Sequence, residues 1–313
     1  MKDLPFTIDA VQTGIAIAYQ NKSLIADSVL PRVPVDAEKF SWEKYDLAQG
    51  ITIPDTKVGR TSQPNQVSFN STTEQARTND YGLDCPIPES DRLNAQASGK
   101  TDPVGTATEF TTDLVLLDRE VRVANTVFNG SNYAADNQQI LSGSSQWSDP
   151  SSDPLKNIME ALDDVIMRPN VGVLGRRTST ILRSHPKVVK AFNGTLGDEG
   201  MVPLNFLKEY LELEEILIGE ANVNIAKPGQ NVQLARTWGN HAAFIYRNKL
   251  ATNQRGATFG FTAQFGDKIA GFITDPDLGL RGGVRVRVGE SVEEVVCAKD
   301  LGYFFQNAVA PKQ

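Results

Sequence analysis

Two histidines are the residues of this chain best suited to acid–base catalysis or to binding a metal ion. His185 lies in a Ser-His-Pro sequence at the start of a predicted helix, and His241 begins an apolar predicted strand. A zinc site needs further His or Cys ligands at short, regular spacings, and neither histidine has such neighbours in the sequence. The sequence therefore predicts no catalytic or metal-binding role for either of them.

Three other patterns were considered for chemistry. Residues 194–200 read GTLGDEG, but the two acidic residues would repel a phosphate group, so a flexible loop is predicted. Asp275-Pro276-Asp277 could bind a divalent cation weakly, although this sequence is typical of a plain turn. Cys85 and Cys297 are too far apart in the sequence for a redox motif. With no nucleophile elbow and no P-loop in the sequence, we predict no catalytic residue, no cofactor site, no metal site and no enzyme.

Composition limits the remaining classes of function. The chain has 313 residues, of which 40% are hydrophobic and 22% charged, as in an ordinary soluble protein. Its net charge of −7 argues against a protein whose task is to grip phosphate backbones, but it permits a surface that encloses nucleic acid. Two cysteines fit a reducing cytosol. No membrane span and no signal peptide are predicted, so the product is expected in the cytoplasm of the producing cell.

The longest predicted element is a helix over residues 103–129. Thr101 and Asp102 are candidate N-caps, Pro103 suits the first turn, and Asn129-Gly130 supplies a stop because Gly tolerates the left-handed conformation. One apolar stripe is expected to pack on the strands predicted at 284–288 and 292–296. Its members recur at steps of four and three residues: Phe110, Leu114, Leu117, Val121, Ala124 and Phe128. The other face is expected toward solvent, and it carries Asp118, Arg119, Glu120 and Arg122.

Residues 1–47 are predicted to form an N-terminal arm. A short helix is expected over 8–19, and Pro31 and Pro34 favour an extended chain after it. The arm is apolar but has no evident local partner. It therefore packs either on another subunit or on its own domain, and the sequence leaves both possibilities open.

Residues 48–92 are polar and are predicted to form an extended loop. Apolar residues alternate with polar ones at 51–53 and at 67–69, which predicts two strands joined by a turn at Ser62–Asn65. A two-stranded hairpin of this kind has little core of its own, so it should gain order from a neighbour. The alternative is a disordered surface loop.

The second half of the chain alternates between helical and strand patterns. Trp147 is expected to anchor a Ser- and Asn-rich loop to a core, and Asp153-Pro154 to cap a helix. Helices are predicted at 154–166, 178–193 with an interruption at His185-Pro186, and 204–211. Strands are predicted at 171–174, 215–220, 232–234, 241–247, 257–265, 284–288, 292–298 and 303–305, with turns at Gly289-Glu290 and at 300–302. Together these patterns indicate an α+β protein.

The order of these elements resembles that of the major capsid proteins of tailed bacteriophages, which have the HK97-type fold that encapsulin shell proteins share. Three stretches carry the resemblance: SLIADSVLPRVPV near the N-terminus, DPLKNIMEALDDVI followed by NVGVLGRRT, and RGGVRVRVGESVEEVVCAKDLGYFFQNAV. It covers nearly the whole chain but rests on element order more than on a short motif. It implies an N-terminal arm (1–47), an extended loop (48–92), a peripheral domain (93–152) with a spine helix (103–129), an axial domain (153–280) and return strands of the peripheral domain (281–313).

The resemblance implies a structural function. Many copies would form hexamers and pentamers of an icosahedral head, or virion shell, around double-stranded DNA, without sequence-specific binding. Assembly would take place in the host bacterial cytoplasm, first as a procapsid that expands with bending of the spine helix. A scaffolding protein, a portal and a decoration protein are the further partners that it implies. Lys57 lies in the extended loop, but nothing around it indicates the covalent cross-link that some relatives form.

Two alternative functions fit the same sequence. An encapsulin-like compartment would share the fold and differ in its cargo. A cytosolic α/β enzyme would use His185 or His241 in a site assembled from distant parts of the chain.

Overall fold

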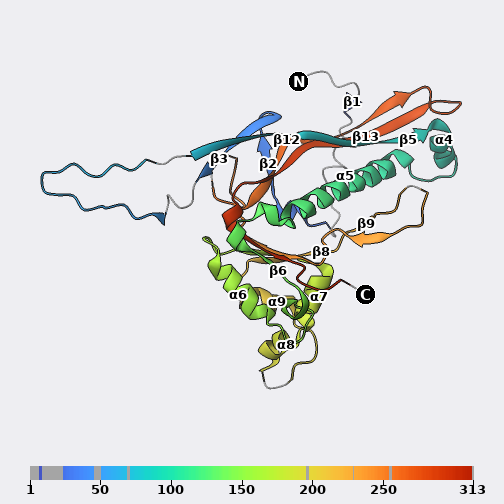
Figure 1. Ribbon diagram of the computed structural model, residues 1–313. Coiled ribbons are helices and arrows are strands. Elements are labelled where there is room, and N and C mark those ends of the chain that lie inside the picture. Colours follow the sequence, from blue (N-terminus) through green and yellow to red (C-terminus); the bar gives the residue numbers. More distant parts are fainter. Residues whose placement is uncertain are drawn as a thin grey trace.

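The computed structural model describes residues 7–8, 24–45, 51–68, 71–194, 197–227, 229–253 and 256–311. Two five-stranded sheets form the body of the protein, and the long helix α5 (Pro103–Val127) runs below the first sheet and reaches the second (Figure 1). Within the described residues, no helix is both long and apolar enough to cross a membrane.

The first sheet is built on the long antiparallel pair β12 (Gly260–Asp275) and β13 (Gly283–Val296). β5 (Asn79–Pro88) pairs with the other side of β13. β1 (Thr7–Ile8) and β2 (Arg32–Val35) both pair with β12, and β2 runs parallel to it. Buried and half-buried positions alternate along much of β13, which explains the period-2 sequence that predicts it.

The second sheet has the strand order β6-β14-β11-β7-β8. Its strands are β6 (Gln138–Ile140), β7 (Val171–Gly175), β8 (Glu215–Gly219), β11 (Ala242–Ile245) and β14 (Gly302–Gln306). Its helices are α6 (Pro154–Asp164), α7 (Arg176–Ser184), α8 (Pro186–Asn193) and α9 (Leu204–Tyr210). These helices pack on one face of the sheet, and the C-terminal half of α5 packs on the other. Every residue of β7 is buried because both faces are covered.

Smaller elements connect these layers. A two-stranded sheet consists of β9 (Asn222–Asn224) and β10 (Leu234–Arg236), and α4 (Glu89–Ala97) precedes α5. In the part of the chain that the structure describes, the short 3-10 helices are η1 (Gly130–Asn132), η2 (Ala135–Asn137), η3 (Gly143–Ser145) and η5 (Lys299–Leu301). The sequence did not predict α4 or β9. Trp147 is buried against the helices of the second sheet, which confirms its predicted role as an anchor.

Helix α5 begins as predicted but ends slightly earlier. The Asp102 side chain accepts a hydrogen bond from the Val104 amide at 3.0 Å, which confirms it as the N-cap. The helix ends at Val127, and the predicted left-handed stop at Gly130 is wrong, since Gly130 begins η1. Asn129 instead caps η1 by accepting a hydrogen bond from the Ser131 amide.

The predicted apolar stripe of α5 is wrong in its first part, whereas Leu117 and Val121 are half-buried and Ala124 and Phe128 pack in the core of the second sheet. Phe110 is 61% exposed and Leu114 is 39% exposed. The buried face consists of Ala107, Thr108, Thr111, Thr112, Val115, Leu116, Arg119, Glu120, Val123, Ala124 and Val127. Threonines can face the sheet because each hydroxyl bonds to a carbonyl one turn earlier, as Thr111 does to Ala107 at 2.6 Å. Polar residue types therefore occupy a buried face that the sequence pattern assigns to solvent.

The described part of the N-terminal arm packs on its own subunit. Residues 24–35 contain α2 (Ala26–Val29) and β2, and the side chains of Val29 and Leu30 are fully buried. This decides between the two possibilities that the sequence left open for this segment. The helix predicted over 8–19 falls on residues outside the described part, apart from Ile8, which lies in β1.

The extended loop differs from its predicted form. The paired strands at its base are β3 (Lys39–Tyr45) and β4 (Ser71–Arg77), and the described residues 51–68 contain no strand. A turn closes between Gly59 and Ser62 instead of at 62–65, through a backbone bond of 3.1 Å. Without a sheet to pack on, the alternating apolar residues of the loop have nothing to cover them, and Ile53 is 91% exposed.

Two predictions about the C-terminal strands are also wrong. No turn forms at Gly289-Glu290, because β13 continues through both residues to Val296. Gly289 has no side chain, and a Cβ there would lie 2.8 Å from the carbonyl oxygen of Tyr81, so this glycine permits close strand packing. β14 forms where a strand was predicted, but it pairs with β11 in the second sheet. β12, within the predicted axial range, pairs instead in the first sheet.

Candidate functional site: a buried polar cluster at the long helix

Arg119 and Glu120 are the centre of a buried polar cluster where α5 meets both sheets. Their exposed fractions are 1% and 0%, so the prediction that both face solvent is wrong. We define the cluster by seven residues that lie on α2, β2, α5, the β10–β11 turn, β12 and β13: Asp27, Arg32, Arg119, Glu120, Trp238, Thr262 and Glu290. Asp27 lies at its half-exposed edge, where its side chain is 57% exposed. Burying charged groups is costly unless each is paired and hydrogen-bonded, so every contact in the cluster matters.

Glu120 acts as an N-cap for a helix that lies elsewhere in the chain. The one-turn helix α2 has no side-chain cap of its own. The Glu120 carboxylate accepts hydrogen bonds from the amides of Ile25 at 3.0 Å and Ala26 at 2.7 Å, and from the Trp238 indole at 2.5 Å. Burial raises the pKa of Glu120, and the hydrogen bonds from Ile25, Trp238 and Ala26 oppose that rise.

Arg119 binds the other end of α2. Its guanidinium donates to the Leu30 carbonyl at 3.2 Å, to the Thr262 hydroxyl at 2.9 Å and to the Asp27 carboxylate. Burial and the nearby Arg32 lower the pKa of Arg119. The segment between Ile25 and Leu30 is thus held at both ends by consecutive residues of α5.

Arg32 links the cluster to the first sheet. It bonds to Asp27 and to Glu290, each at 2.7 Å, and to the Gln264 side chain at 3.0 Å. Burial favours neutral Asp27, but the Arg119 and Arg32 guanidiniums outweigh this and lower the pKa of Asp27. Burial also opposes the charge on Arg32, yet Glu290 and Asp27 raise its pKa overall.

Arg247 connects the same segment to the second sheet. Its side chain is 3% exposed and donates to the Ser28 carbonyl and, at 2.5 Å, to the Glu215 carboxylate at the start of β8. The N-terminal segment, α5 and both sheets therefore meet through charged side chains.

The two histidines occupy separate structural positions. His185 is buried and caps α8, because its Nδ1 accepts a hydrogen bond from the Lys187 amide at 3.2 Å. Its Nε2 lies 3.2 Å from the Ser152 hydroxyl and 3.1 Å from the Asp149 carbonyl. Each ring nitrogen has a partner, which is the geometry of a structural histidine.

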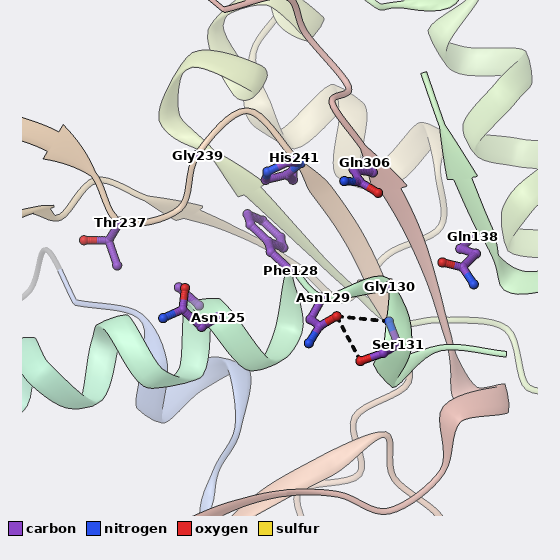
Figure 2. A pocket seen from close by; sticks show the side chains of 11 residues that line it. Asn125, Phe128, Asn129, Gly130, Ser131, Gln138, Thr237, Gly239, His241 and Gln306 are labelled. Atoms are coloured by element: carbon purple, nitrogen blue, oxygen red, sulfur yellow. Dashed lines mark hydrogen bonds between the residues drawn. The ribbon is translucent and has the colours of Figure 1, made fainter. Parts of the chain in front are cut away.

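His241 lines a cavity of about 560 Å³ at the C-terminal end of α5 (Figure 2). Its Nδ1 accepts a hydrogen bond from the Asn307 amide at 2.9 Å, and burial lowers its pKa. The lining is neutral and rich in amides: Ala124, Asn125, Phe128, Asn129, Gly130, Ser131, Gln138, Thr237, Gly239, His241 and Gln306. The lining contains no acidic residue, and the Ser131 hydroxyl bonds to Asn129 instead of to His241, so the groups needed for acid–base catalysis are not assembled here.

The other sequence motifs do not come together either. Asp275 accepts a hydrogen bond from the Asp277 amide at 3.1 Å, as expected of a turn. Gly194 has φ of 62° and ends α8 as predicted. Cys85 and Cys297 do not form a disulfide. Among the residues that the structure describes, no group of three or more potential metal ligands exists.

Comparison with known proteins identifies the family. No protein-family model matches the chain. The chain is, however, 61% identical over 310 residues to the major capsid protein of Pseudomonas phage JBD67, and the match covers 99% of this chain and 100% of that protein. This chain belongs to the phage major capsid proteins. The major capsid protein of Burkholderia phage BcepMu is 27% identical over 223 residues, covering 68% of this chain and 69% of the relative.

Solved structures show the HK97-like capsid fold. A phage-related protein from Bordetella bronchiseptica superimposes with a TM-score of 0.77 at 20% identity, covering 99% of this chain and 100% of that chain. The capsid protein of cyanophage P-SCSP1u superimposes with a TM-score of 0.59 at 10% identity, covering 98% of this chain and 92% of that chain. The chain of the virus-like particle from Pyrococcus furiosus superimposes with a TM-score of 0.56 at 10% identity, covering 95% of this chain and 96% of that chain. The protein is a structural capsid subunit of the virion and not an enzyme.

The buried polar cluster is not predicted by the sequence pattern. Its one visible signal is the charged sequence Asp118–Glu120 within the apolar residues of the long helix. A helical wheel assigns such residues to solvent, because the wheel shows which residues share a face but not what packs against that face.

Proposed function

We propose that this capsid subunit assembles into hexamers and pentamers of an icosahedral head that encloses double-stranded DNA. In this proposal, residues 1–47 are the arm and 48–92 contain the extended loop. The first sheet with α5 forms the peripheral domain, and the second sheet with α6 to α9 forms the axial domain, so β12 belongs to the peripheral domain and β14 to the axial domain. The capsid would assemble in the host bacterial cytoplasm as a procapsid, with a scaffolding protein, a portal and a decoration protein as partners. Membership of the phage major capsid family supports the proposal.

The extended loop is the feature that best supports the proposed contacts between subunits. It projects from the body of the protein beyond β3 and β4 (Figure 1). Ile51, Ile53 and Val67 on it are 66%, 91% and 60% exposed. Apolar side chains on a projecting, coreless segment gain stability when a second surface covers them. We infer that the surface is that of a neighbouring subunit.

The net charge supports enclosure of DNA without tight binding. At −7 for each subunit, a shell would repel phosphate groups on average instead of holding them. DNA could then move past the inner surface during packaging.

A loop deletion tests the proposal most directly. Residues 51–68 should be replaced by a short Gly-Ser linker, which leaves the β3–β4 pairing in place. We expect the purified subunit to keep its circular dichroism spectrum and its thermal midpoint while the yield of closed shells, counted by electron microscopy, falls at least tenfold.

The wild-type chain and a variant with an equally long Gly-Ser replacement of residues 51–68 are the controls. The second control separates loop length from loop side chains. Shells at wild-type yield from the shortened variant would reject the loop as a subunit contact. A wild-type protein that stays monomeric under every condition in size-exclusion chromatography would contradict the assembly proposal itself.

A further inference from the structure

The N-terminal segment, residues 24–35, is held mainly by side chains from other elements. Its α2 turn makes its own helical hydrogen bonds. The amides of Ile25 and Ala26, which have no partner within that turn, donate to the Glu120 carboxylate. The Leu30 carbonyl accepts from Arg119 and, at 3.1 Å, from the Thr262 hydroxyl. The segment thus depends on a few long side chains at its first half.

The backbone of the second half of the segment pairs at the edge of a sheet, and its Val33 and Val35 side chains pack in a small core with Phe261. β2 pairs with β12 over the four residues from Arg32 to Val35, and in the described chain it pairs with no other strand. On its other side β12 pairs with β13 over nearly its whole length, and no β2 residue takes part in that pairing. The second sheet contains no strand from this segment. Release of residues 24–35 would therefore remove β2 from the first sheet and leave the pairing of β1, β12, β13 and β5, and the whole second sheet, in place.

We propose that residues 24–35 form a detachable strap, which opens as one unit while both sheets stay folded, and that Glu120 and Arg119 control its opening. The strap crosses α5 where that helix passes from the first sheet to the second. When the strap opens, the middle of α5 loses its cover. The proposal concerns the single subunit and does not depend on shell geometry.

The balance of forces favours a segment that can open and close. Closing buries the apolar side chains of Val29 and Leu30 against α5 and Phe259. It also removes Arg119 and Glu120 from water, and that cost is recovered when the strap opens. A buried network of hydrogen bonds is strong when every donor and acceptor in it has a partner. Removal of one partner weakens the remaining hydrogen bonds of the network as well. Loss of the Glu120 carboxylate should therefore shift the equilibrium toward the open state.

Hydrogen–deuterium exchange of the full-length unassembled subunit tests this without any substitution. Amides of residues 25–35 should exchange together, and well before those of Val173 in β7 and Phe244 in β11. Those two strands lie in the centre of the second sheet, so they report global unfolding. Exchange of residues 25–35 in step with β7 and β11 would overturn the proposal.

Glu120→Ala provides the second test. It leaves the amides of Ile25 and Ala26 and the Trp238 indole without their acceptor, which should speed exchange of residues 25–35 by roughly tenfold to a hundredfold. Exchange of β7 and β11 should change less than threefold. Glu109→Ala, an exposed acid on the same helix, is the matched control and should change neither.

Two further variants keep the test decisive. Glu120→Gln keeps an oxygen acceptor, so it should restore part of the slow exchange that Glu120→Ala loses. If Glu120→Ala does not fold, Asp27→Asn removes a half-exposed partner of Arg119 and Arg32, and it should speed exchange of the same residues by a smaller factor. Equal acceleration of the strap, β7 and β11 by either variant would show that the cluster is an ordinary part of the core.

Discussion

At the scale of single residues, the most informative feature is the pair of charged residues buried in α5. Glu120 and Arg119 do not bind each other as an isolated ion pair. Glu120 accepts from backbone amides and an indole, and Arg119 donates to a carbonyl, a hydroxyl and Asp27. Such contacts fix the position of a segment more strictly than apolar packing does, because each hydrogen bond needs a defined geometry.

The raised pKa of Glu120 predicts a specific pH dependence of stability. The folded protein binds the Glu120 proton more tightly than the unfolded chain, whose pKa is 4.5. The stability that this residue contributes is therefore fully present below about pH 4.5 and is lost as the pH rises through the raised pKa. We expect the free energy of unfolding of the wild type, relative to Glu120→Gln, to increase as the pH falls from 7 to 5.

Urea unfolding of both proteins at pH 7, 6 and 5 measures this difference. Each unit by which folding raises the pKa contributes about 1.4 kcal/mol. His241, Asp27 and other groups titrate in both proteins, so their contributions to the pH dependence of the free energy of unfolding cancel in the difference. A difference that stays constant, or that decreases toward pH 5, would show that folding does not raise the pKa of Glu120.

At the scale of elements, α5 shows how an apolar pattern can point to the wrong face. The stripe from Phe110 to Val121 has helical spacing, yet Phe110 and Leu114 are exposed. The first sheet packs on smaller side chains because α5 lies close to β13 and β5, where Ala107 and the threonines fit. Close packing of a helix on a sheet selects for volume and shape as well as for hydrophobicity.

This arrangement predicts a clear contrast between two substitutions in α5. Val123→Ala removes two methylene equivalents from a fully buried site and should lower the free energy of unfolding by about 1–3 kcal/mol. Phe110→Ala removes a larger side chain that is 61% exposed, so it should cost less than about 1 kcal/mol. Chemical denaturation of the unassembled subunit measures both. A larger loss for Phe110→Ala would place that side chain in the core of the monomer.

At the scale of the whole molecule, α5 joins two sheets that have separate cores. Its first half packs on β13 through Ala107, and its second half packs on the second sheet through Val123 and Val127. The helix is about 38 Å long, so it determines how far apart the two sheets lie. The buried polar cluster lies at the crossing point.

The charge of the whole molecule predicts how assembly responds to salt. Subunits that each carry −7 repel one another, and at 0.1 M salt this repulsion is screened beyond about 10 Å. We expect the rate and the yield of shell assembly to rise as sodium chloride increases from 50 to 300 mM. Light scattering with electron microscopy of the products measures both. A fall in yield over this range would indicate that attractive charge pairs between subunits dominate.

The sequence by itself determined the elements whose signals are local. Asp102 with Pro103, Asp153 with Pro154, and Gly194 mark helix ends through backbone rules that need no tertiary partner. The apolar run of β7 likewise follows from burial on both faces. The order of such elements was sufficient to indicate the fold and the family.

Tertiary structure alone decided which groups meet. Nothing local shows that Gly289 allows close strand packing instead of a turn, or that β14 pairs in the second sheet. The buried polar cluster joins Ile25 to Glu120 across 95 residues of chain. A charged residue is buried only when distant groups satisfy its hydrogen bonds, and only the folded chain brings those groups together.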